Sequence, residues 1–190
     1  PVYGELVWDG DVSPEGVAFV SEYDDFNFSF GQYAVAEDTN DQLEDAWMSV
    51  ASIDTAIGDF TIGGSYSFYG DMNGKGIASG DSRGNAWTDS DDDGKNNEDM
   101  FLSDFGIADI VLAYNLDNIT LSAELIENLR AADSVDSSGI AIGLSMKTEG
   151  GDKFYISHQS IDQDAVFTGF SEDDTLDQAS NYEGQILGYK

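Results

Sequence analysis

Apolar and polar side chains alternate with a period of two residues in several runs of about ten residues along the chain. In 26–31 every second residue is phenylalanine, and the same alternation recurs in 60–68, 119–125 and 140–147. Successive side chains of a β-strand point to opposite faces of the sheet. Each run therefore predicts a strand with one apolar face and one polar face.

Strands predicted in this way account for most of the chain. They are 15–23, 26–36, 45–55, 60–69, 106–116, 119–128, 138–147, 153–161 and 181–190, with a partial strand at 2–8. A length of about nine to eleven residues is what a tilted strand needs to cross the hydrocarbon layer of a membrane. Strands of soluble proteins are most often about five or six residues long.

The predicted connections alternate between short and long. The short ones are Asp24-Asp25, 56–59, Asp117-Asn118 and 148–152, and the long ones are 37–44, 70–105, 129–137 and 162–180. Outer-membrane barrels have short periplasmic turns at one rim and longer extracellular loops at the other. The pattern predicts an all-β fold, an antiparallel transmembrane β-barrel, with 1–190 as a single β-barrel domain and 70–105 as a long acidic extracellular or constriction loop.

The two faces of the predicted strands have different chemistry. The outward face is expected to contact lipid and comprises Val17, Phe19, Tyr23, Phe26, Phe28, Phe30, Met48, Val50, Phe60, Ile62, Tyr66, Phe68, Ile110, Leu112, Tyr114, Ile119, Leu121, Leu125, Ile140, Ile142, Leu144, Phe154 and Ile156. The opposite face is small and polar, and it includes Glu124, Lys147, Gln159, Glu183 and Gln185. Such a lining suits a water-filled channel. The alternative is a soluble β-sandwich whose core is the apolar face.

The chain is strongly acidic, with 38 Asp and Glu against 7 Lys and Arg and a formal net charge of −31. This charge argues against nucleic acid as a partner and against docking on anionic lipid head groups. No stretch approaches the roughly 18 consecutive apolar residues of a membrane helix. A mean hydropathy of −0.31 does not exclude a barrel, because half of each spanning strand faces water.

An aspartate-rich segment lies within the long 70–105 connection. Asp89, Asp91, Asp93 and Gly94 match the first half of a D-x-D-x-D-G calcium loop, in which carboxylates converge on the ion. Met100 stands where that loop would have its bidentate glutamate. The alternative is a solvated acidic loop, or one that narrows the channel, in which the side chains of Asp89, Asp91, Asp92 and Asp93 attract cations.

Catalytic patterns are weak. His158 is the only histidine, and the chain has no cysteine. The segment 80–84, GDSRG, superficially resembles the nucleophile segment of a serine protease, but Arg83 interrupts the glycine run that should follow the serine. The sequence therefore predicts no enzyme activity and no required cofactor other than the Ca²⁺ considered above.

The segment 4–23, GELVWDGDVSPEGVAFVSEY, carries a resemblance to a known family. It is similar to the porin family of Gram-negative bacterial outer-membrane β-barrel proteins, whose signature is matched here by Trp8, Asp9, Asp11, Pro14, Glu15 and Gly16. The likeness continues through 28–45 and returns at 163–170. The resemblance implies a barrel in the bacterial outer membrane that allows passive diffusion of small hydrophilic solutes.

These observations predict a porin that prefers cations, an ion transport protein without catalysis. Outer-membrane lipid and lipopolysaccharide would surround it, and the resemblance implies a homo-oligomer such as a trimer. Nine or ten strands are expected to be part of a larger barrel, because bacterial single-chain barrels have an even number of strands. The predicted pore-lining or constriction residues are Asp89, Asp91, Asp92, Asp93, Glu124, Lys147, Gln159 and Glu183. The alternative is a secreted or surface-layer β-protein that calcium stabilises in a structural role.

Overall fold

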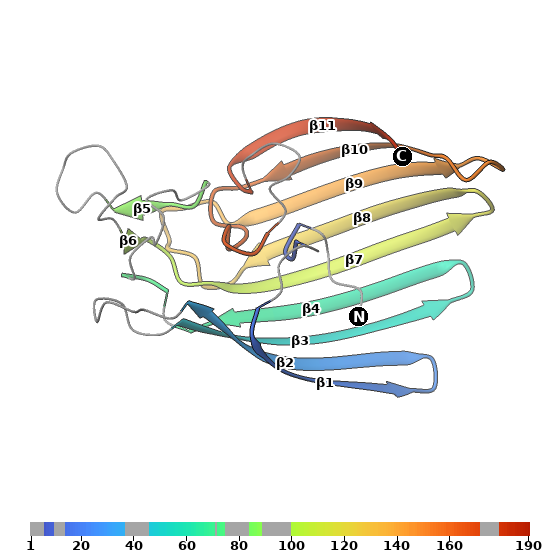
Figure 1. Ribbon diagram of the computed structural model, residues 1–190. Coiled ribbons are helices and arrows are strands. Elements are labelled where there is room, and N and C mark those ends of the chain that lie inside the picture. Colours follow the sequence, from blue (N-terminus) through green and yellow to red (C-terminus); the bar gives the residue numbers. More distant parts are fainter. Residues whose placement is uncertain are drawn as a thin grey trace.

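The computed structural model describes residues 6–9, 14–36, 46–70, 72–74, 84–88, 100–171 and 179–190. This part of the chain is all-β and antiparallel, which confirms the predicted all-β, antiparallel class; the sheet formed by the described residues is not closed into a barrel. The main feature is one sheet of nine strands in which each strand pairs with its neighbours in chain order (Figure 1). Within the described ranges, no helix has the length and apolar character needed to cross a membrane.

The strand boundaries agree closely with the predicted ranges. The nine strands are β1 (Gly16–Tyr23), β2 (Phe26–Ala36), β3 (Ala46–Ile57), β4 (Phe60–Tyr69), β7 (Gly106–Leu116), β8 (Ile119–Asn128), β9 (Ser138–Lys147), β10 (Lys153–Ile161) and β11 (Tyr182–Tyr189). Two short strands, β5 (Trp87–Thr88) and β6 (Met100–Phe101), form a separate pair. The predicted partial strand at 2–8 is wrong over 6–8, because the described residues 6–9 form a turn and a bend.

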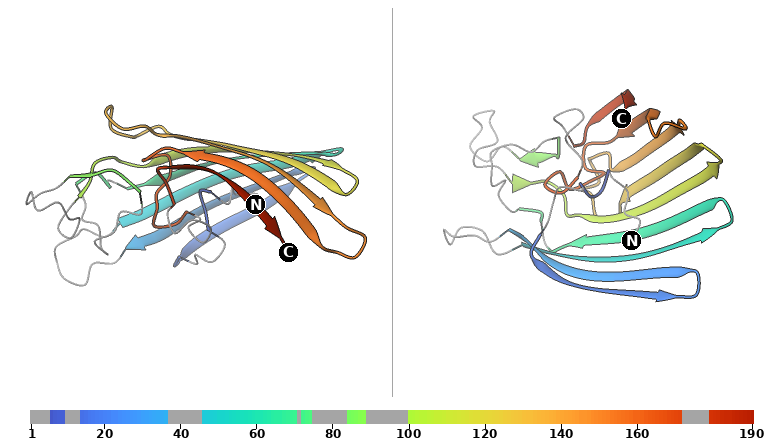
Figure 2. Two further views of the ribbon diagram at one scale, coloured as in Figure 1. Left: turned by 90° about the horizontal axis from the view of Figure 1, so that it is seen from above. Right: turned by 45° about the vertical axis from the view of Figure 1, so that its right-hand side comes forward.

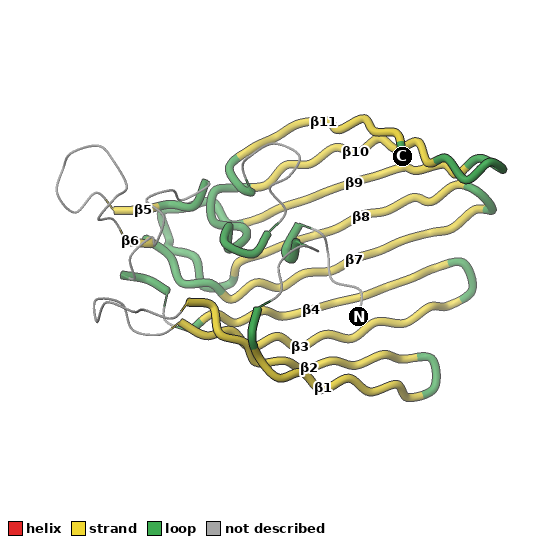
Figure 3. The backbone as a smooth tube through the Cα atoms, viewed as in Figure 1, coloured by secondary structure: helices red, strands yellow, loops and turns green. Residues whose placement is uncertain are grey.

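The short turns gather at one end of the sheet, here called the turn end, and the long connections start from the other, the loop end (Figure 3). Asp24 and Asp117 lie in two of the turns with positive φ angles of 51° and 48°, and Gly58 lies in a third with 61°. Aspartate and glycine tolerate this left-handed backbone better than most residues. Local turn chemistry therefore fixes the pairing of three successive hairpins.

Curvature gives the sheet a convex face and a concave face (Figure 2). Residues that pair across strands share a face, so the register assigns each side chain to one side. Most large apolar side chains of the convex face are exposed; they include Val17, Phe19, Phe28, Phe30, Ile53, Ile62, Ile110, Leu112, Leu121, Leu125, Ile140, Ile142, Leu144, Phe154, Ile156 and Leu187. We call this surface the convex band.

Strand β3 differs from the predicted orientation. Met48 and Val50 lie on the concave face and are buried, whereas Trp47 and Ile53 lie on the convex face and are exposed. The first residues of β3, AWMSV, are apolar on both faces, so alternation alone does not determine which face points outward. Placing Met48 and Val50 outward was therefore wrong.

The hydrophobic core covers only the loop end of the concave face. Met48, Tyr69 and Ile107 contribute to it from the sheet, and Leu6 and Phe167 from segments folded over the sheet. The ring centroids of Tyr69 and Phe167 lie 4.8 Å apart. Beyond this core, concave side chains of β2 and β3 such as Ser29, Ser52 and Asp54 are buried, whereas those of β8, β9 and β10 are exposed or half-buried.

Candidate functional site

The open part of the concave face is a polar wall formed mainly by β8, β9 and β10. Glu124 pairs with Ala141 and Ala141 with Gln159, so the two predicted wall residues Glu124 and Gln159 lie in one row across three strands. Lys147 lies on the same face at the turn end of β9. The structure thus brings three of the predicted pore-lining residues to one surface.

A hollow of about 520 Å³ lies over this wall. Its polar lining comprises Thr120, Ser122, Glu124, Ser145, Lys153, Tyr155, Ser157, Gln159 and Lys190, and Leu6 approaches from the N-terminal segment. Hydroxyl, amide and charged groups of this kind can hydrate or bind small polar solutes.

Glu183 is placed on the other side of the sheet. It pairs with Ser160 on the convex face, where its Oε1 atom lies 3.8 Å from Nε2 of His158. The prediction that Glu183 shares a polar wall with Glu124 and Gln159 was wrong. In β11 the concave side carries Tyr182, Gly184 and Ile186, so polarity does not identify the inner face of this strand.

The predicted constriction acids Asp89, Asp91, Asp92 and Asp93 lie outside the described residues. The calcium site predicted at Asp89, Asp91 and Asp93 therefore stays a prediction. Within the described ranges, no group of three or more histidine or acidic residues is arranged to hold a metal ion.

Asn85 holds the segment 163–168 against the loop end of the concave face. Its Nδ2 atom donates to the carbonyl oxygens of Gln163 (3.0 Å) and Val166 (2.8 Å) and to Oδ1 of Asp164 (3.2 Å). Its Oδ1 atom accepts hydrogen bonds from the backbone nitrogen (3.0 Å) and Oγ1 (2.8 Å) of Thr168. One buried amide thus fixes the backbone of a whole loop segment.

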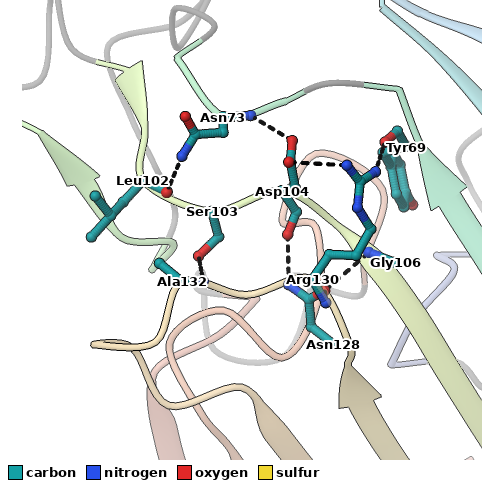
Figure 4. Close-up of polar contacts among 9 residues, drawn as sticks. All are labelled: Tyr69, Asn73, Leu102, Ser103, Asp104, Gly106, Asn128, Arg130 and Ala132. Carbon is teal, nitrogen blue, oxygen red and sulfur yellow. Dashed lines mark hydrogen bonds and ion pairs between the residues drawn. The ribbon is translucent and has the colours of Figure 1, made fainter.

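A second polar cluster lies around Asn128, the last residue of β8, and Arg130 in the connection that follows it (Figure 4). Asn128 donates to the carbonyl oxygens of Asp104 and Asp164, at 3.0 Å each, and accepts from the backbone nitrogen of Gly106 at 2.9 Å. Arg130 forms a 3.0 Å ion pair with Asp104 and lies 4.7 Å from the ring centroid of Phe68. Together these contacts hold the backbone around Asp104 and Asp164 against the loop ends of β7 and β8.

Asn85, Asn128 and Arg130 were not predicted as important residues. Their contacts join segments far apart in sequence, so no local pattern reveals them. Arg130 could have been singled out from the sequence in one respect, because it is one of only 7 basic residues among 38 acidic ones.

Asp164 is buried at the centre of this arrangement, and its Oδ1 atom accepts a 2.7 Å hydrogen bond from the backbone nitrogen of Ala86. Burial raises the pKa of the Asp164 carboxyl, and hydrogen bonds from Ser103, Ala86 and Asn85 partly oppose that rise. The folded state therefore favours the protonated acid more than the unfolded state does. The stabilisation from this group is present at low pH and is lost as the pH rises through the pKa of the folded protein.

We expect Asp164→Asn to weaken the fall in stability as the pH rises from acidic to neutral, because the amide keeps an acceptor for Ala86 without the buried charge. The measurement is the urea midpoint at several pH values, followed by tryptophan fluorescence; Trp8 reports on this region through its 5.6 Å ring contact with Phe170. Asp136→Asn is the matched control, since Asp136 is exposed. Equal pH dependence in wild type and Asp164→Asn would contradict the assignment.

No protein-family model, curated protein or solved structure matches the chain.

Proposed function

We propose that this chain forms the wall of a bacterial outer-membrane porin through which small hydrophilic solutes diffuse passively. The observation that supports the proposal is the convex band, an exposed apolar surface that extends over all nine strands of the sheet. Soluble monomers rarely expose contiguous apolar patches larger than a few hundred Å². A lipid environment removes the cost of exposing such a surface to water.

The band runs from one edge of the sheet to the other. Phe19 in β1 is 68% exposed, Ile142 in β9 is 54% exposed and Leu187 in β11 is 78% exposed. Aromatic rings lie at the turn end, where Phe60 stacks on Tyr114 at 4.3 Å and Phe154 lies 4.9 Å from Tyr189. Aromatic residues are typical of the interface between membrane and water.

The concave face supports the proposed passage of solutes. Its small hydroxyl and amide groups would line a hydrated passage, and the net charge of −31 favours cations and neutral molecules over anions. Passage requires neither catalysis nor a cofactor. In this proposal outer-membrane lipid and lipopolysaccharide surround the barrel, and subunits assemble as a homo-oligomer such as a trimer.

Within the described residues, β1 and β11 each pair with only one strand, so the sheet is open. Unpaired backbone groups cost several kcal/mol each in hydrocarbon. The proposal therefore requires further strands, from this polypeptide or from another chain, to complete the barrel.

Reconstitution of the full-length protein tests the proposed function. The protein should need detergent for extraction, migrate differently on a gel before and after heating, and produce a conductance in planar bilayers with cations more permeant than anions. A protein that a calcium chelator releases into water and that gives no conductance would instead support the surface-layer alternative. The heated sample of the same preparation is the control for conductance.

A further inference from the structure

We infer that Lys147, Lys153 and Lys190 form a binding site for an oxyanion, a phosphate or carboxylate group of a passing solute, at the turn end of the concave face. The role of this site within a pore rests on the proposed function. The site itself follows from the register of β9, β10 and β11. We call the three residues the lysine row.

The register places the three lysines side by side. Lys153 pairs with Lys147 across β9 and β10. On its other side, Lys153 and Lys190 exchange two backbone hydrogen bonds of 2.8 and 2.9 Å, which makes them directly opposite residues of an antiparallel pair. Directly opposite residues have Cβ atoms about 5 Å apart on one face. Three ammonium groups can therefore reach a common point.

Such a row is unexpected in this chain. Like charges directly opposite each other destabilise a sheet, and these lysines are three of only seven basic residues among 38 acidic ones. Within the described part of the chain, no carboxylate lies within ion-pair distance of any of the three ammonium groups. The Nζ atom of Lys153 lies 5.9 Å from the ring centroid of Tyr155, a contact that leaves its charge in place. The positive charge is therefore available to a ligand.

The surroundings of the lysine row provide space and further donors. Lys153 and Lys190 line the hollow of about 520 Å³, together with the hydroxyl groups of Ser145, Tyr155 and Ser157. Glu124 lies in the same row across the sheet as Gln159. Gln159 is six residues from Lys153 along β10, so this row is about 20 Å from the lysine row. The hollow thus has separated positive and negative ends.

Ammonium groups bind phosphate and carboxylate through charge-assisted hydrogen bonds. Several ammonium groups around one site favour a divalent oxyanion over chloride, because the attraction grows with the ligand charge. The lysine row would give anionic solutes a local binding position within an otherwise negative passage. Inorganic phosphate is the simplest probe of this chemistry.

Binding of inorganic phosphate to the full-length protein in neutral detergent, measured by isothermal titration calorimetry at fixed ionic strength, tests the inference. We expect saturable binding that chloride does not match. Lys153→Gln should weaken it at least tenfold, and Lys153→Arg should retain most of it. Succinate, tested in the same way, reports on carboxylate ligands. Lys95→Gln is the matched control, because it changes the charge equally at a lysine that lies, in sequence, between β5 and β6 and not in β9, β10 or β11.

Circular dichroism of each variant verifies that the β-structure is retained. Equal affinity of wild type and Lys153→Gln, or binding of phospholipid in mixed micelles without binding of inorganic phosphate, would overturn the inference. Calorimetry does not depend on channel formation. If the protein conducts ions but does not bind phosphate, the inferred site is contradicted and the proposed function is not. If it binds phosphate but does not conduct ions, the proposed function is contradicted and the inferred site is not.

Discussion

Asn85→Ala is expected to detach the segment 163–168 from the concave face. The substitution removes five hydrogen bonds and leaves the carbonyl oxygen of Val166 without its amide donor, whereas that of Gln163 keeps the 2.7 Å hydrogen bond from Oγ of Ser180. A buried polar group left unsatisfied costs about 1–3 kcal/mol. We therefore expect the free energy of local opening to fall by about 3 kcal/mol, which corresponds to roughly a hundredfold increase in the open population.

Hydrogen exchange of the backbone amides of 163–168, followed by mass spectrometry, measures this opening. The expected result is exchange roughly a hundredfold faster in this segment, with little change in β8 and β9. Asn118→Ala is the matched control, because Asn118 is exposed and its side chain donates one hydrogen bond, to the carbonyl oxygen of Lys147. Unchanged exchange in Asn85→Ala would show that the segment is held by apolar packing alone.

Ile142→Arg is expected to reduce insertion into membranes strongly. Ile142 lies near the middle of β9 in the convex band, and an arginine at the bilayer midplane on the lipid face of a barrel costs about 2–4 kcal/mol. Combining it with Leu112→Arg on β7, which also lies in the band, should increase the loss further. The measurement is the fraction of refolded protein that floats with lipid vesicles in a density gradient.

Ser157→Arg provides the control for this experiment. Ser157 is on the neighbouring strand β10 but faces the hollow on the concave side, where water solvates the guanidinium. We expect it to insert like the wild type. If Ile142→Arg also inserts normally, the convex band does not contact lipid, and a second protein layer that covers it becomes the better explanation.

The strands were predictable because their signal is local. Period-two alternation and aspartate or glycine in the turns fix each hairpin without reference to distant residues, and the structure confirms the nine ranges within a few residues. The prediction of which face of a strand points outward was wrong where the alternation of apolar and polar residues is weak. The start of β3 is apolar on both sides, and the concave side of β11 carries Tyr182 and Ile186.

The candidate site was only partly predictable. Glu124, Lys147 and Gln159 were placed on one face by alternation, and the register agrees. Asn85 could not be found, since its partners are 78 to 83 residues away and lie in an irregular segment. The lysine row was also missed, because it depends on which residues three different strands place opposite one another.

The order of the nine strands constrains how the sheet can become a cylinder. In an antiparallel sheet, direction reverses at each step, so the first strand, β1, and the ninth, β11, point the same way (Figure 1). Joining them directly would create a parallel seam, whose slanted hydrogen bonds are slightly weaker per residue. Only an odd number of added strands lets every neighbour run in opposite directions. The total is then even, as in bacterial single-chain barrels.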